Sequence, residues 1–173
     1  MSDTPVPGAD VATRACPSRT PAVDASAMPA DDRRAALRGR RVLVVDDNPI
    51  NLRYLSHLLG QLGMVVQTAG DGAQALLQAA AQPFDLVLMD VSMPVMNGLD
   101  ATRALRARAV PGARGLPIIG VSAHTMFGDR EQCLAAGMSD YVGKPIQREL
   151  LIAAMIQQLA GARPAADSKD SSD

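Results

Sequence analysis

The sequence predicts an α/β fold in which a parallel sheet of five strands is covered on both faces by five helices. Short apolar runs rich in β-branched residues alternate with helical patterns through most of the chain, which is the order typical of such folds. Polar residues follow the ends of four of these runs. A doubly wound sheet binds its ligands beyond the carboxyl ends of its strands, so we expect the functional site there.

Local patterns predict the individual elements. The apolar runs predict strands at residues 41–46, 64–68, 84–90, 117–122 and 139–142. The periodic segments predict helices at about residues 49–62, 72–82, 98–107, 129–136 and 147–159. Asn48 before Pro49 and Asp71 before the second helix are suitable N-caps. In the last helix we expect the side facing the core to carry Leu150, Leu151, Ala154, Met155 and Ile156.

Composition sets the boundaries of the folded part. With 173 residues, 47% hydrophobic content and a net charge of −1, the chain fits one ordinary domain plus unstructured sequence. Residues 1–39 are rich in Pro, Ala, Ser, Thr and Asp, so we expect a disordered tail or linker. Residues 161–173 have the same character and are expected to form a disordered C-terminal tail. The folded domain should therefore occupy residues 40–160.

The same composition argues against several classes of protein. A charge near neutrality gives no basic surface for nucleic acid. Cys16 and Cys133 lie in segments of different character, which does not favour a disulfide framework. Neither a membrane-spanning run nor a signal peptide is recognisable. We therefore expect a cytoplasmic protein without membrane insertion.

The polar residues at the strand ends suggest phosphoryl chemistry. They are Asp46, Asp47, Asp90, Ser122 and Lys144, the last being one of only two lysines beside fifteen arginines. Three carboxylates close together repel one another unless a cation joins them, and an all-oxygen set suits Mg²⁺. With Asp46 and Asp47 as metal ligands, the carboxylate of Asp90 could attack a phosphoryl group. Lys144 and Ser122 would then stabilise the phosphoryl oxygens.

Four segments carrying these residues resemble the receiver domain of two-component response regulators. They are Val44-Val45-Asp46-Asp47-Asn48-Pro49, Met89-Asp90-Val91-Ser92-Met93-Pro94-Val95-Met96-Asn97-Gly98, Val121-Ser122-Ala123 and Gly143-Lys144-Pro145. The likeness covers about residues 40–160 and is specific, because the motifs occur in the family's order and separation. It implies a flavodoxin-like sheet with strand order 2-1-3-4-5.

The resemblance also implies roles for individual residues. Asp90 would accept a phosphoryl group from phosphohistidine on a histidine kinase or a histidine phosphotransfer protein. Asp46, Asp47 and Asp90 would hold Mg²⁺ together with the backbone carbonyl of Ser92. The protein would be a phosphoacceptor with only self-catalysed phosphorylation and dephosphorylation, and not an enzyme with turnover.

Further residues are implied to act in switching. Ser122 and Tyr141 look like the switch pair, in which the hydroxyl moves toward the phosphate while the ring turns inward. Lys144 resembles the family's lysine before a cis proline bond, which would aim the ammonium at the site. Ser92, Ala123 and His124 would modulate how easily water reaches the acyl phosphate.

The subfamily and the output remain open between alternatives. Asp-Asp-Asn-Pro-Ile-Asn after the first strand and Ser-Ala-His after the fourth are most similar to receivers of hybrid sensor kinases. The chain could be a free-standing receiver or part of a hybrid kinase. We expect output through protein contact or phosphoryl transfer, with the downstream target bound by the helix at 129–136, the strand at 139–142 and the helix at 147–159.

Three other functions fit the sequence less well. A Mg²⁺-dependent phosphohydrolase would also form an aspartyl phosphate, but no cap domain or second acid one residue on from Asp90 supports it. A dinucleotide-binding domain would need a glycine-rich turn where Asp46-Asp47-Asn48-Pro49 stands. A receiver-like scaffold that works without phosphorylation would not need the three acids Asp46, Asp47 and Asp90, which are all present.

Overall fold

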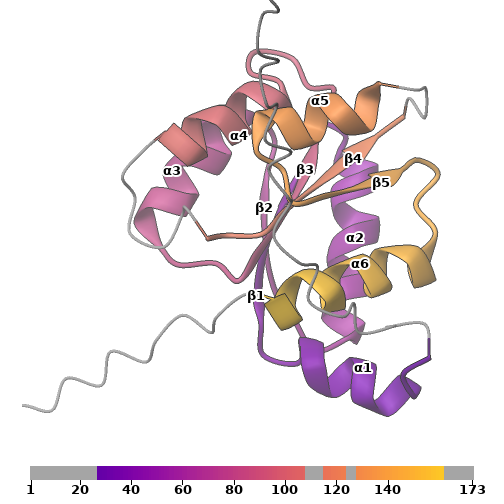
Figure 1. Ribbon diagram of the computed structural model, residues 1–173. Coiled ribbons are helices and arrows are strands. Elements are labelled where there is room, and N and C mark those ends of the chain that lie inside the picture. The colour runs from indigo at the N-terminus through magenta and orange to yellow at the C-terminus, as the bar shows by residue number, and fades with distance from the viewer. Residues whose placement is uncertain (1–26, 108–114, 124–127, 162–173) are drawn as a thin grey trace, which may run out of the picture.

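The computed structural model describes residues 27–107, 115–123 and 128–161. Five parallel strands form one sheet in the order β2-β1-β3-β4-β5, with helices on both faces (Figure 1). The strands are β1 (Arg41–Val45), β2 (Val65–Ala69), β3 (Leu86–Asp90), β4 (Ile118–Ser122) and β5 (Asp140–Gly143). The described helices are α1 (Ala30–Leu37), α2 (Pro49–Gln61), α3 (Gly72–Ala81), α4 (Gly98–Ala107), α5 (Asp129–Ala136) and α6 (Arg148–Gly161). The predicted fold class and strand order are confirmed.

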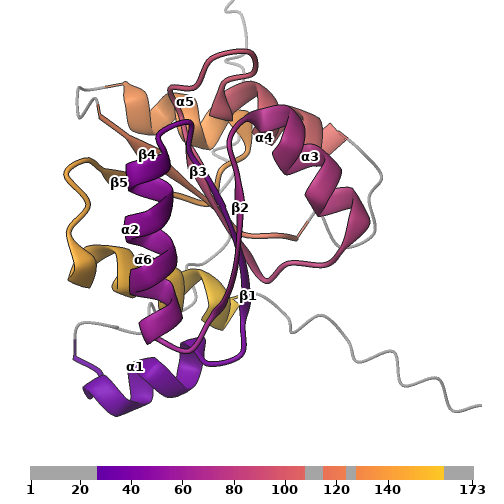
Figure 2. The same ribbon diagram turned by 180° about the vertical axis from the view of Figure 1, so that it is seen from behind.

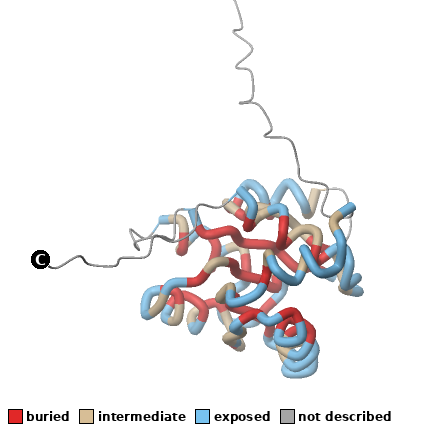
Figure 3. Tube along the Cα trace, turned by 90° about the horizontal axis from the view of Figure 1, so that it is seen from below, coloured by how far each residue is buried: buried red, intermediate tan, exposed pale blue. Residues whose placement is uncertain are grey.

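Alternation along the strands divides the core into two apolar layers. Val42 and Val44 of β1 pack with residues of α2 and α6 on one face of the sheet. Leu43 and Val45 point the other way and pack with α3, α4 and α5, as expected for successive residues of a strand. Figures 1 and 2 show these two groups of helices on opposite sides of the sheet, and Figure 3 shows the burial concentrated between them.

Both predicted helix caps are present. The side chain of Asn48 accepts a hydrogen bond from the backbone N–H of Ile50, and that of Asp71 accepts one from Gln74. These side chains satisfy backbone donors that have no partner inside the helix. Among the described helices, none has the length and apolar character needed to span a membrane.

The expected inner face of the last helix is wrong at one position. Leu150 is 57% exposed, whereas Ile152 and Leu159 are buried with Leu151 and Met155. Residues 150–156 of α6 are all apolar, so spacing alone does not determine which of them face the sheet. The packing of α6 against the sheet makes that selection.

The expectation of disorder up to residue 39 is wrong for α1. This helix lies beside α6 (Figure 1), and its Leu37 is fully buried. Met28 and Ala36 pack against the same core cluster. The composition of residues 1–39 as a whole does not reveal that one short stretch within them packs on an apolar surface. The expectations for residues 1–26 and 162–173 lie outside the described residues.

We predict that α1 stabilises the domain. Deleting residues 1–37 should lower the free energy of unfolding by about 3 kcal/mol, because Leu37 loses its burial and the core beneath it is exposed. Urea denaturation measures this difference. Deletion of residues 1–26, which keeps α1, is the matched control. If both deletions unfold at the same urea concentration, α1 is not part of the cooperative unit.

Candidate functional site

Four predicted site residues meet at the carboxyl edge of the sheet. Asp46 directly follows β1, Asp90 ends β3, Ser122 ends β4 and Lys144 directly follows β5. Asp46, Asp90 and Ser122 are 2%, 4% and 3% exposed, whereas Asp47 at the same edge is exposed. The edge therefore presents two buried carboxylates, one accessible carboxylate, a hydroxyl and an ammonium.

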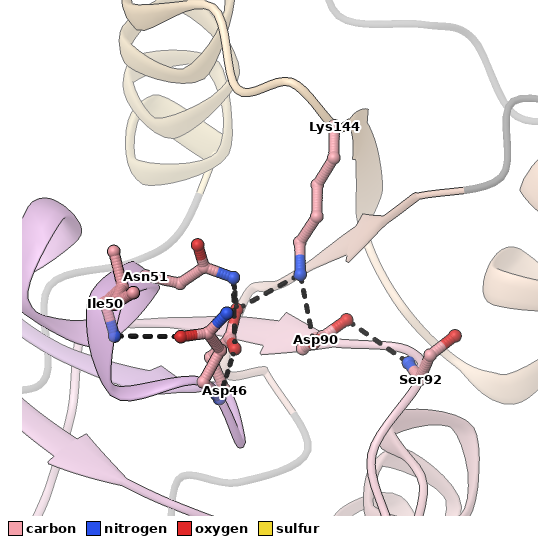
Figure 4. A network of polar contacts seen from close by, with 7 residues as sticks. Asp46, Ile50, Asn51, Asp90, Ser92 and Lys144 are labelled. Atoms are coloured by element: carbon pink, nitrogen blue, oxygen red, sulfur yellow. Dashed lines mark hydrogen bonds and ion pairs between the residues drawn. The ribbon is translucent and has the colours of Figure 1, made fainter.

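Lys144 joins the two buried carboxylates. Its Nζ donates to Oδ2 of Asp90 at 3.0 Å and to Oδ2 of Asp46 at 3.2 Å (Figure 4). Burial alone would lower the pKa of Lys144, but its hydrogen bonds and charge interactions with Asp90 and Asp46 raise it above the ordinary value. The Lys144-Pro145 peptide bond is cis, as the resemblance implied. The ammonium is therefore held charged between the two acids.

Asp46 has further partners on the loop and helix that follow it. Its Oδ1 accepts from the backbone N–H of Asn48 at 2.8 Å, and the Nδ2 of Asn51 lies 3.0 Å from its Oδ2. Asn51 was not predicted as a site residue. A polar side chain in the first turn of a helix that starts at the strand end is the signal that could have identified it. Both contacts hold the carboxylate in one orientation.

The three acids can hold a metal ion. Asp46, Asp47 and Asp90 each offer an oxygen, and these oxygens lie within 4.8 Å of one another. Burial raises the pKa of Asp90 above its usual value, and the charge of Asp46 adds to this, although Lys144 and the backbone N–H of Ser92 counteract it. Hard oxygen ligands with repelling charges fit Mg²⁺. The residues present therefore suit the predicted cofactor.

The predicted switch residues are also in contact. Tyr141 of β5 is half-buried, packs against the layer formed with α3, α4 and α5, and makes a side-chain hydrogen bond with Ser122. Burial raises the pKa of Tyr141. Of the three residues expected to modulate the site, Ser92 and Ala123 are exposed, and His124 lies outside the described residues. The side chains of Ser122 and Tyr141 are thus hydrogen-bonded to each other beside the acid cluster.

The loop after β3 returns closely against the carboxyl edge of the sheet. Gly98 donates its backbone N–H to the carbonyl of Val91 at 3.1 Å. A Cβ atom at position 98 would lie 2.1 Å from the backbone oxygen of Asp90, so only glycine fits there. This approach explains why the motif that begins at Asp90 ends in glycine.

The charge on Asp90 should destabilise the metal-free domain at neutral pH. A raised pKa in the folded state means that folding favours protonated Asp90, so its stabilising contribution is present below the unfolded pKa and is lost as the pH rises through the folded pKa. We predict that Asp90→Asn melts at a higher temperature than wild type at pH 7, and that the gap shrinks toward pH 4.

Differential scanning calorimetry in buffer without divalent ions measures this gap. Millimolar Mg²⁺ should raise the melting temperature of wild type more than that of Asp90→Asn, because binding to the folded state stabilises it and the variant lacks one ligand charge. A variant that melts at or below the wild-type temperature at pH 7 would show that repulsion at Asp90 is not the controlling interaction.

Residues 42–156 match the family described as the response regulator receiver domain. Similar curated proteins include the signal transduction histidine-protein kinase BarA of Shigella flexneri, 44% identical over 64% of this chain. The sensor protein GacS of Pseudomonas syringae is 44% identical over 66% of the chain, and the sensor histidine kinase RcsC of Salmonella typhimurium is 38% identical over 73%. The matched part spans only 12–13% of the length of these relatives.

Solved structures show the same likeness. The receiver domain of the sensor histidine kinase PA1611 from Pseudomonas aeruginosa, with a magnesium ion coordinated in its active site cleft, is 40% identical with a TM-score of 0.65 and covers 70% of this chain and 98% of its own. The chemotaxis protein CheY4 of Vibrio cholerae is 32% identical with a TM-score of 0.63, covering 68% and 96%. This chain belongs to the response regulator receiver domain family of two-component phosphorelay signalling, and it is homologous to the receivers of hybrid sensor histidine kinases.

Proposed function

We propose that this chain accepts a phosphoryl group from phosphohistidine onto Asp90, with Mg²⁺, and changes its protein contacts as a result. The observation that carries the proposal is the ammonium of Lys144 held between the buried carboxylates of Asp46 and Asp90. These two acids and Asp47 form the cluster that suits a divalent cation. The arrangement presents a nucleophile, a cation and a metal site at one edge of the sheet.

The chain's own residues supply most of the chemistry. A carboxylate oxygen of Asp90 attacks phosphorus, the O–P bond forms, the N–P bond breaks, and its electron pair stays on the imidazole nitrogen of the donor. Lys144 shifts from the carboxylates toward a phosphoryl oxygen as negative charge gathers there. Mg²⁺ held by Asp46, Asp47, Asp90 and the backbone carbonyl of Ser92 would add positive charge at the same oxygens.

The contact between Ser122 and Tyr141 supports a role in switching. When the hydroxyl of Ser122 turns to a phosphoryl oxygen, the hydroxyl of Tyr141 loses a partner and the ring can turn inward. Ala123 and His124 follow Ser122 in the sequence, and with Ser92 they would modulate water access. The surface that changes would be α5, β5 and α6, where Arg130 is exposed.

The relatives support the choice of partners. Because similar curated proteins include histidine kinases, one of them named as a hybrid kinase, the donor would be a histidine kinase or a histidine phosphotransfer protein. The target would be a protein bound through the changed surface, and the site of action would be the cytoplasm. The chain would serve either as a free-standing receiver or as the receiver of a hybrid kinase.

The test is intact-protein mass spectrometry after incubation with Mg²⁺ and acetyl phosphate, and separately with a phosphohistidine donor. Wild type should gain one phosphoryl group that hydroxylamine removes, whereas Asp90→Asn should gain none. Asp100→Asn, which changes an exposed acid of α4, is the matched control and should behave as wild type. Retained phosphorylation in Asp90→Asn would overturn the assignment of the acceptor.

Two further variants should separate acceptance from switching. Lys144→Arg should still be phosphorylated, about tenfold more slowly, because a planar guanidinium replaces the point charge of the ammonium. Ser122→Ala should be phosphorylated without the change in hydrogen exchange across β5 and α5 that accompanies phosphorylation of wild type. Hydrogen exchange with mass spectrometry measures that change. If Ser122→Ala shows the wild-type change in hydrogen exchange on phosphorylation, Ser122 has no role in switching.

A further inference from the structure

One acid near the switch pair has a buried oxygen that the proposed chemistry does not use. Oδ2 of Asp129, the first residue of α5, is buried and has no hydrogen-bond partner among the described residues. Leaving such an oxygen without a donor costs about 1–3 kcal/mol or more, and native structures rarely do so. The cost suggests that the oxygen has a partner in another state of the protein.

Tyr141 is the group placed to become that partner. Asp129 and Cys133 lie four residues apart on α5, so their side chains share one face of the helix. Cys133 is 1% exposed and belongs to the core cluster against which Tyr141 packs. The helix α5 itself packs on β5, the strand that carries Tyr141 (Figure 1). The face of α5 that carries Asp129 is therefore the face turned toward Tyr141.

Electrostatics agree with this placement. Burial is the main cause that raises the pKa values of Tyr141 and Cys133, and the negative charge of Asp129 raises both further. In the structure described, the hydroxyl of Tyr141 is engaged with Ser122. The carboxylate of Asp129 is thus near the ring while the hydroxyl has another partner.

We propose that Oδ2 of Asp129 accepts a hydrogen bond from the hydroxyl of Tyr141 when Ser122 turns to the phosphoryl group. This inference rests on the proposed function, because the phosphoryl group draws Ser122 away. A buried carboxylate is a strong acceptor for a phenol, and the bond forms only in the phosphorylated state. A contact made in one state alone shifts the equilibrium toward that state. Asp129 is a positioning residue for Tyr141 and touches neither phosphorus nor metal.

A local role at the helix terminus is the alternative. A carboxylate in the first turn of α5 also interacts favourably with the helix dipole. That interaction is present in both states and does not involve the hydroxyl of Tyr141. The two roles therefore differ in whether the effect of removing Asp129 depends on that hydroxyl.

Intrinsic tyrosine emission can report on Tyr141 directly. The chain has two tyrosines and no tryptophan, so Tyr54→Phe leaves Tyr141 as the only strong emitter. In this background, emission is recorded before and after addition of Mg²⁺ and acetyl phosphate, while mass spectrometry measures the phosphorylated fraction. Asp129→Ala should be phosphorylated within twofold of its parent, but the ratio of switched to unswitched Tyr141 should fall about tenfold, as expected for one hydrogen bond to a charged group.

Asp129→Asn is the matched control, because it removes the charge and keeps an acceptor oxygen. Its ratio of switched to unswitched Tyr141 should lie between those of the parent and Asp129→Ala. If Asp129→Ala does not fold, Asp129→Leu fills a similar volume without an acceptor and replaces it. If folded Asp129→Ala or Asp129→Leu gives the wild-type emission response, the inference about Asp129 is overturned. That result leaves the assignment of Asp90 as the phosphoryl acceptor unchanged. If the Tyr54→Phe protein that keeps Asp129 is not phosphorylated, the proposed function itself is overturned, and the inference with it.

A double-mutant cycle excludes the local role. Asp129→Ala should reduce the change in hydrogen exchange of α5 upon phosphorylation in the protein with Tyr141, and should have no effect in Tyr141→Phe. An equal reduction in both backgrounds would show that Asp129 acts through the helix terminus alone, which contradicts the proposal.

Discussion

The ammonium of Lys144 between two buried carboxylates is the interaction on which the site depends. Asp46 and Asp90 stand at the ends of the neighbouring strands β1 and β3, where desolvation and mutual repulsion oppose their charges. The chain supplies the compensating cation from β5, at the edge of the sheet beyond β4. Removing Lys144 would leave two buried carboxylates without a compensating cation, which is strongly unfavourable. The charges of β1, β3 and β5 are therefore energetically linked.

This link explains how an event at one residue can reach the surface. A phosphoryl group carries about 1.5 to 2 negative charges and replaces the single charge of the Asp90 carboxylate, where the three acids already repel one another. Lys144 and Tyr141 lie three positions apart on the same segment, and Ser122 contacts both through its backbone carbonyl and its side chain. A new anion that attracts Lys144 and Ser122 therefore acts on Tyr141, and through Tyr141 on α5. Asp129 would give the displaced tyrosine hydroxyl a defined acceptor.

Much of the fold was predictable because its signals are local. Short β-branched runs mark the strands, and the caps Asn48 and Asp71 depend only on residues that follow them within three positions. The acids, the hydroxyl and the lysine each follow a predicted strand. That order alone predicts that they lie at one edge of the sheet. In contrast, α1 depends on a surface that exists only after α2 and α6 have packed. The exposure of Leu150 and the contact of Asn51 with Asp46 also arise from tertiary packing, which sequence periodicity does not encode.

The central claim is that Asp90, and neither of its neighbouring acids, carries the phosphoryl group. Reduction of the phosphorylated protein with borohydride converts an aspartyl phosphate into homoserine, and peptide mass mapping then locates it. We predict homoserine at position 90 alone, with Asp46 and Asp47 unchanged. Homoserine at position 46 or 47, or none in a protein that has gained a phosphoryl group, would contradict the account.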